Sequence, residues 1–182
     1  MRDDAPGCPA PPPSTIPATG DDRPGAPLLA AGPWIDAAAA LPADPGAYLL
    51  ALWLASPAPL PPRFAGHPPL PPGWYVYAGS AHGPGGLRAR VGRHLRPDKP
   101  RRWHVDWITA VATRRLARLL PGGTECAPVM VLLAHAPPAR VPVPGFGSSD
   151  CRACPAHLLA LSDDLAATLG LPSPVSSVLR LS

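Results

Sequence analysis

The sequence predicts an α/β domain of the α+β kind, in which a small three-stranded antiparallel sheet is flanked by helices. Two apolar runs bounded by glycine and proline are separated by a proline-rich loop, which is typical of an antiparallel strand pair. Further along, apolar residues recur every four positions, which is the spacing of one helix face. The 182 residues suit one ordinary domain with tails. We therefore expect the element order β-β-α-α-β-α.

Proline marks the segments that lie outside these elements. The chain has 31 prolines among 182 residues, far above the usual share of about 5%. Many of them fall in residues 5–33 and 57–72, where a fixed φ and a missing N–H group disfavour helix interiors and central strands. We expect residues 1–33 to form a disordered Pro/Ala-rich extension and residues 34–182 to form the folded domain.

Three strands are expected from composition and alternation. The stretch AYLLALWLA, residues 47–55, is a short apolar run with glycine before it and proline after it. GWYVYAG, residues 73–79, is aromatic and β-branched with glycine at both ends. TRRLARLLP, residues 113–121, alternates basic and apolar residues and follows the predicted helices. The first two runs predict an antiparallel pair joined by a long loop.

Four helices are expected. The first follows Leu87, where apolar residues recur every four positions, and it ends before Pro97. The others are expected over WHVDWITAVA, over ECAPVMVLLAHA with Thr124 as its cap, and over residues 162–169.

Positive charge is concentrated in one segment. The formal net charge of the chain is +4, but residues 85–118 hold ten basic and two acidic residues, a net +8, so the remainder is negative. Such a stretch supplies the sequence-independent part of nucleic-acid affinity, although a solvated helix face has the same composition. The candidate nucleic-acid contacts are Arg88, Arg93, Arg96, Lys99, Arg101 and Arg102.

Five polar side chains at the predicted elements are candidates for chemistry. Tyr48 and Tyr77 lie on the two predicted strands, and Arg90 and His94 lie four residues apart beside the apolar stripe of the first helix. Glu125 is the only glutamate in the chain. Each has an ordinary structural explanation as well: a strand-edge phenol, a surface arginine, a helix histidine or an acidic residue at a helix start.

The order of the motifs resembles a known nuclease superfamily. GAY, YVYAGSA, RARVGRH, WHVD and a late glutamate occur in the order found in GIY-YIG nucleases. Within that superfamily the blocks GWYVYAGSA, RVGRHLR, WHVDW, EC and GFGSSDCRACPAHL most resemble the group called domain of unknown function 123, or Uri-type endonucleases. The resemblance covers about residues 45–161. It implies a GIY-YIG-like domain in which GAY replaces the GIY tripeptide and a proline-rich insertion replaces a short hairpin.

The resemblance also implies roles for individual residues. Tyr48 and Tyr77 correspond to the two motif tyrosines, and Arg90 corresponds to the superfamily arginine. His94 follows Arg90 by one helical turn, His104 begins the second predicted helix, and Glu125 is the expected metal ligand.

These roles describe an endonuclease that hydrolyses DNA, including branched or damaged DNA, with Mg²⁺ or Mn²⁺. Arg90 suits phosphate oxygens because a guanidinium donates two parallel hydrogen bonds and keeps its charge. A lone Glu125 suits one metal ion better than two. Tyr48 is the expected general base, and its pKa, ordinarily about 10, would have to be lowered by Arg90 and the metal. A nucleic-acid-binding module without activity and a zinc-stabilised interaction domain are the alternatives.

Cysteine spacing predicts a second possible metal site. Cys151, Cys154 and His157 follow one another at intervals of three residues, and Cys126 can complete a Cys₃His set for structural Zn²⁺. Structural cysteines without metal and a redox pair are the other interpretations.

No secretory signal and no apolar run of about 20 residues is evident, so the simplest expectation is a cytoplasmic protein without a membrane partner. Because no targeting domain is recognisable, a partner protein that selects the DNA substrate is also considered.

Overall fold

The computed structural model describes residues 32–36 and 41–173. The expected Pro/Ala-rich extension therefore lies almost entirely outside the described residues, as does the end of the expected folded domain, residues 174–182. The described part is a mixed α+β structure, as the sequence predicts.

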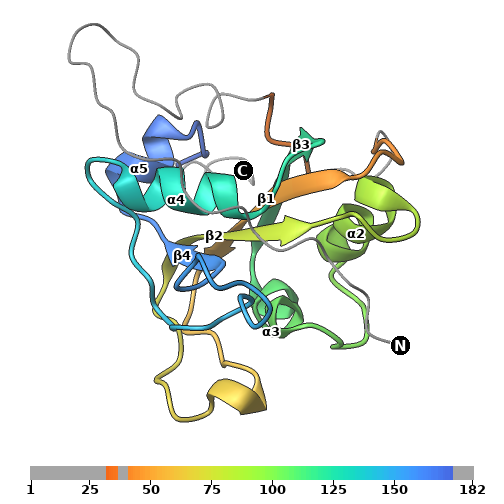
Figure 1. Ribbon diagram of the computed structural model, residues 1–182. Helices are drawn as coiled ribbons and strands as arrows, with labels where there is room; N and C mark the ends of the chain where they lie inside the picture. Colours follow the sequence, from red (N-terminus) through yellow and green to blue (C-terminus); the bar gives the residue numbers. More distant parts are fainter. Residues whose placement is uncertain (1–31, 37–40, 174–182) are drawn as a thin grey trace, which may run out of the picture.

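One four-stranded antiparallel sheet organises the structure, with the strand order β3-β1-β2-β4 (Figure 1). The strands are β1 (Gly46–Leu54), β2 (Gly73–Ser80), β3 (Arg114–Pro121) and β4 (Leu158–Ala160). The first three match the predicted strands, so the expected antiparallel pair and its long loop are confirmed. Within that loop lies the short 3₁₀ helix η1 (Pro62–Phe64).

The predicted strand count of three is wrong because β4 was missed. This strand has only three residues, which is too short to show periodicity in the sequence. It exists because its backbone pairs with the free edge of β2, where Tyr77 lies opposite Leu158 and Tyr75 lies opposite Ala160. A pairing between residues so far apart in sequence is decided by tertiary packing.

In the described part of the chain four α-helices surround the sheet, as predicted. They are α2 (Gly86–Leu95), α3 (His104–Val111), α4 (Cys126–Ala134) and α5 (Asp163–Thr168). Ser162 caps α5, because its side chain accepts a hydrogen bond from the Leu165 backbone at 3.2 Å. The expected Thr124 cap of α4 is wrong: Glu125 occupies the N-cap position and makes no side-chain cap hydrogen bond.

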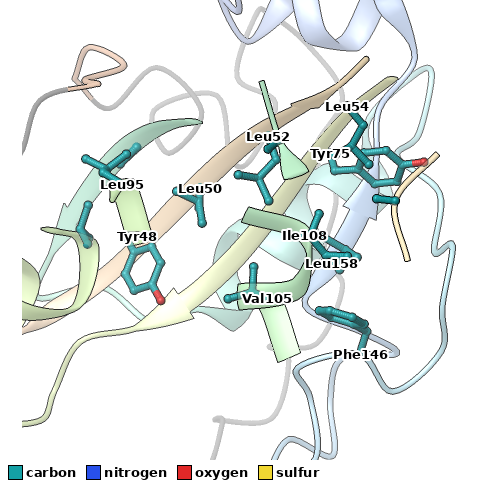
Figure 2. Close-up of a cluster of buried hydrophobic side chains, with 14 of the residues drawn as sticks. Tyr48, Leu50, Leu52, Leu54, Tyr75, Leu95, Val105, Ile108, Phe146 and Leu158 are labelled. Carbon is teal, nitrogen blue, oxygen red and sulfur yellow. The ribbon is translucent and has the colours of Figure 1, made fainter. Parts of the chain in front are cut away.

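Alternation along β1 divides the interior into two layers. Figure 2 shows Tyr48, Leu50, Leu52 and Leu54 in one cluster with side chains from α2 and α3. The intervening residues Ala47, Leu49 and Ala51 face a second cluster that includes α4 and α5. The central strands are therefore buried on both faces, which explains why β1 reads as a continuous apolar run.

Within the described part of the chain, no helix has the length and apolar character needed to cross a membrane.

Candidate active site and neighbouring metal cluster

The two motif tyrosines lie on the face of the sheet that α2 and α3 cover. Tyr48 on β1 is opposite Gly79 on β2, and Tyr77 is two residues before Gly79. This diagonal register places two side chains on the same face about 7–8 Å apart at their backbones. Tyr48 is only 2% exposed, whereas Tyr77 is half-buried. Gly79 leaves room for the Tyr48 phenol, because a Cβ there would overlap the Tyr48 ring and hydroxyl.

Helix α2 brings Arg90 and His94 to the tyrosines. The His94 ring lies between two aromatic rings, with centroid distances of 5.6 Å to Tyr48 and 5.2 Å to Trp103. Arg90 lies one helical turn earlier, and its guanidinium stacks on Trp103 with its carbon 3.8 Å from the ring centroid. Trp103 immediately precedes α3, so the contact between α2 and α3 orients both functional side chains of α2.

Electrostatics places Glu125 within reach of the same groups. Burial is the main reason that the pKa of Tyr48 lies well above its ordinary value, and burial likewise raises the pKa of Tyr77 to about 12. For both phenols Arg90 lowers the pKa and Glu125 raises it. The charges of Arg90 on α2 and of Glu125 at the start of α4 therefore both act on the phenols of β1 and β2. Without further positive charge, both phenols are neutral at neutral pH.

Asp106 is a buried member of this site that the sequence analysis did not single out. Its carboxylate accepts hydrogen bonds from both Nη atoms of Arg93 at 2.9 and 3.0 Å. It also accepts backbone N–H bonds from Arg102 at 2.8 Å and Trp103 at 2.9 Å. The block WHVD could have indicated this role of Asp106, because an acidic residue three positions after a helix N-cap commonly accepts a hydrogen bond from the N-cap backbone.

The Asp106 carboxylate also faces His94. Its Oδ1 lies 3.7 Å from His94 Nδ1, and neither ring nitrogen of this fully buried histidine has a hydrogen-bond partner among the described residues. Burial lowers the pKa of His94, although the nearby Asp106 opposes the shift. His94 is therefore a neutral imidazole with an acceptor nitrogen beside the Tyr48 ring.

A basic pocket opens beside Arg90. Its volume is about 290 Å³, and its lining includes Arg90, Arg93, Arg102 and Trp103. The guanidinium groups of Arg90 and Arg102 are chemically suited to phosphate. Arg93 is instead held by Asp106, and Arg90 stacks on the Trp103 ring.

The six predicted nucleic-acid contacts divide into two groups. Arg93 is held by Asp106, Arg88 donates to a backbone carbonyl at 2.9 Å, and Lys99 donates to two carbonyls at the end of α2 at 2.8 and 3.1 Å. These three side chains have structural partners. The other three, Arg96, Arg101 and Arg102, are exposed, as is Arg88.

His104 lies at the start of α3, beside the proline-rich loop. The centroid of its ring lies 5.3 Å from that of Phe64 and 5.9 Å from that of Phe146. Burial lowers the pKa of His104, and the positive charge of Arg63 lowers it further. Phe146 in turn contacts the Tyr77 ring at 6.5 Å. Phe146 therefore contacts both His104 and Tyr77, and no ring contact joins His104 directly to Tyr77 among the described residues.

The predicted metal-ligating residues come together next to Glu125. The ligand atoms of all four side chains lie within 4.8 Å of one another, and this set can hold a metal ion such as zinc. We call it the Cys₃His cluster: Cys126, Cys151, Cys154 and His157.

The redox state of Cys126 determines whether all four ligands are available. The Sγ atoms of Cys126 and Cys151 lie 3.5 Å apart, well beyond the roughly 2.05 Å of an S–S bond. These two sulfurs are therefore not bonded to each other. Cys126 is disulfide-bonded in this structure, and its thiolate becomes available only on reduction. The complete Cys₃His cluster is therefore a property of the reduced chain.

Comparison with known proteins identifies one family. No curated protein and no solved structure matches the chain. The family model described as Domain of unknown function DUF123 matches residues 47–171, which is more than half of the sequence. The match spans Tyr48, Glu125 and His157, so it includes the candidate catalytic side chains and the Cys₃His cluster. The chain therefore belongs to the DUF123 family.

Proposed function

We propose that this protein is a divalent-metal-dependent endonuclease that hydrolyses DNA phosphodiester bonds with one metal ion, as its resemblance to GIY-YIG nucleases implies. The observation that carries the proposal is that Arg90 and Glu125, from two separate helices, both act electrostatically on the phenols of Tyr48 and Tyr77 on neighbouring strands. Phosphodiester cleavage needs a group to activate water, positive charge for the phosphate and a ligand for the metal. This set of side chains contains all three.

Glu125 is the residue that would hold Mg²⁺ or Mn²⁺. It is half-buried, and its charge acts on both tyrosines, so a cation held by this carboxylate would act on the same two phenols with the opposite sign. Mg²⁺ commonly binds through one or two carboxylates together with water and substrate phosphate. Such an ion would supply Lewis acidity toward the phosphate and positive charge beside the phenols.

Arg90 is suited to hold the phosphate. Its stacking on Trp103 limits the motion of the guanidinium, and its position in the lining of the basic pocket directs it toward an anionic ligand. Arg102, also in the lining, is exposed and adds a second cationic contact.

The phenols and His94 would handle protons. Tyr48 is neutral in the metal-free protein because burial raises its pKa, so its role as general base depends on the positive charge of Arg90 and of the bound cation. His94 has an acceptor nitrogen and lies next to the Tyr48 ring, so it can relay the proton. Tyr77 is less buried and is suited to orient the water or the phosphate.

A DNA-binding module without catalytic activity is the second candidate. It is favoured by the same raised pKa of Tyr48, because a phenol that stays neutral cannot act as a base. It retains the exposed arginines and the basic pocket. Mutation of the metal ligand separates the two candidates.

Glu125→Gln is expected to lower Mg²⁺- or Mn²⁺-dependent cleavage by about 100-fold or more, the equivalent of roughly 2.7 kcal/mol in the transition state. The amide keeps the size of the side chain but removes the anionic metal ligand. Cleavage is measured on single-stranded, duplex, flap and branched DNA, and affinity is measured over a range of salt concentrations. DNA affinity should remain within about threefold, because the basic contacts are unchanged.

Asp164→Asn on α5 is the matched control and should cleave like the wild type. Cleavage by Glu125→Gln at the wild-type rate would contradict the proposal. Salt-sensitive DNA binding by a wild-type protein that cuts no substrate would establish the non-catalytic module.

Arg90→Lys is expected to reduce cleavage by roughly 10- to 100-fold, because lysine keeps the charge but loses both the planar fork and the stacking on Trp103. The rates of Arg90→Lys and of the exposed control Arg96→Lys are compared under single-turnover conditions. Equal rates for the two variants would show that Arg90 acts only as a surface charge.

A further inference from the structure

We propose that the Cys₃His cluster binds a structural Zn²⁺ ion that fixes one wall of the candidate active site. The ligands come from three segments: the first residue of α4, the loop before β4, and the residue that immediately precedes β4. One ion would therefore join the start of α4 to the edge of the sheet. The metal site itself stands independently of the proposed nuclease activity, and only its effect on cleavage rests on that function.

The distances suit tetrahedral zinc. With Zn–S bonds of about 2.3 Å, tetrahedral thiolate sulfurs lie about 3.8 Å apart. The Sγ atoms of Cys126 and Cys151 are separated by 3.5 Å, and every pair of ligand atoms in the cluster lies within 4.8 Å. Once Cys126 is reduced, side-chain movements of about 1 Å complete the site.

The surroundings of the Cys₃His cluster favour a bound metal ion. Cys126, Cys154 and His157 are 7%, 6% and 4% exposed. The Nε2 atom of His157 has no hydrogen-bond partner among the described residues, and an unsatisfied buried ring nitrogen destabilises a fold. A metal bond would satisfy it. In addition, the backbone N–H of Cys154 donates to the Cys151 sulfur at 3.3 Å, the kind of contact that stabilises a thiolate ligand.

The cluster is connected to the tyrosine site through Gly147 and Phe146. The His157 backbone N–H donates to the Phe146 carbonyl at 2.8 Å, and the His157 imidazole interacts with the Gly147 backbone. Gly147 has φ +75° and packs so closely on Tyr77 that a Cβ would lie 2.7 Å from the ring. Loss of the metal would therefore loosen the wall that supports Tyr77.

The second connection runs through the chain itself. Cys126 is the first residue of α4 and directly follows Glu125, whose own side chain makes no cap contact. Anchoring Cys126 to the ion would hold the Glu125 backbone in position. Four protein ligands leave no open coordination position, so the ion is structural and is distinct from the proposed catalytic cation.

Metal content tests the site without reference to activity. The full-length chain, purified under reducing conditions, is expected to contain about one zinc per molecule, and Cys154→Ser or His157→Ala to retain less than about a tenth of that. Glu125→Gln and Cys8→Ser are the matched controls and should retain the ion. Titration of chelator-treated wild-type protein with Co²⁺ provides a measurement that does not depend on whether a variant folds. Strong visible absorption from tetrahedral cobalt–thiolate is expected.

Limited trypsin digestion measures how far the ion orders the surrounding loop. Arg152 is exposed in the loop that carries Cys151 and Cys154. Arg63 is exposed in η1 and serves as an internal reference. Removal of the metal should increase the rate of trypsin cleavage after Arg152 by at least about tenfold and leave the rate after Arg63 unchanged, because the order of the loop around Arg152 depends on the ion.

Reduced wild-type protein without zinc and without a cobalt spectrum would overturn the metal site. Zinc whose removal alters neither Arg152 cleavage nor DNA cleavage would overturn its wall-fixing role. Stoichiometric zinc in a protein that cuts no DNA would retain the metal site and refute the nuclease.

Discussion

Asp106→Ala is expected to destabilise the protein by about 3–5 kcal/mol, because removal of one partner leaves the other charge of a buried pair uncompensated. Asp106 is 1% exposed and is bonded to both Nη atoms of Arg93. The same substitution removes the acceptor for two backbone N–H groups at the start of α3. The free energy of unfolding is measured by urea titration. Asp98→Ala, an exposed residue, is the control and should change stability by less than about 0.5 kcal/mol.

The pH dependence of Asp106→Asn tests the same interaction. Burial alone would raise the pKa of this carboxyl, but the nearby His94 and the hydrogen bonds from Arg93 and the backbone hold it well below its usual range. A lowered folded pKa contributes stability above the unfolded value of about 4, and that contribution disappears as the pH falls toward the folded pKa. The wild type should therefore lose stability in acid more steeply than Asp106→Asn. Parallel acid curves would show that the ion pair contributes nothing.

Gly79→Ala is expected to lower stability by about 1–3 kcal/mol and to reduce DNA cleavage more than tenfold, because an added Cβ overlaps the Tyr48 phenol in a closely packed interior. The buried ring has to move, which displaces its hydroxyl from the site. Unfolding free energy and single-turnover cleavage are measured together. A stable Gly79→Ala protein with wild-type cleavage would contradict the contact.

Two variants separate packing from chemistry at this position. Tyr48→Phe retains the ring but lacks the hydroxyl, so it should fold with nearly wild-type stability and lose cleavage. Tyr48→Leu removes the overlapping atoms, so Gly79→Ala should destabilise the Tyr48→Leu protein by less than it destabilises the wild type. A double-mutant cycle that showed full additivity would mean that the two side chains do not compete for space.

The candidate active-site residues could be predicted from the sequence better than the contacts that hold their side chains in place. Tyr48, Tyr77, Arg90 and Glu125 are recognisable in the sequence because strand and helix periodicity places them and an ordered set of motifs surrounds them. The side chains that hold them are harder to predict. Asp106 has the sequence position of an ordinary acidic residue at a helix start, and its two hydrogen bonds from Arg93 form only when α2 packs against α3. The stacking of Arg90 on Trp103 depends on the same contact.

By itself the sequence determined the elements that local chemistry controls: three strands from apolar and aromatic runs, four helices from spacing and proline, and membership of the DUF123 family from five motif blocks. Only the tertiary structure decided the strand order and the existence of β4, which is a three-residue segment paired with the distant strand β2. The same holds for the room that Gly79 leaves for Tyr48 and for the meeting of Cys126 with His157. These features join residues far apart in the chain, and sequence periodicity records only which face a residue presents, not which distant residue it meets.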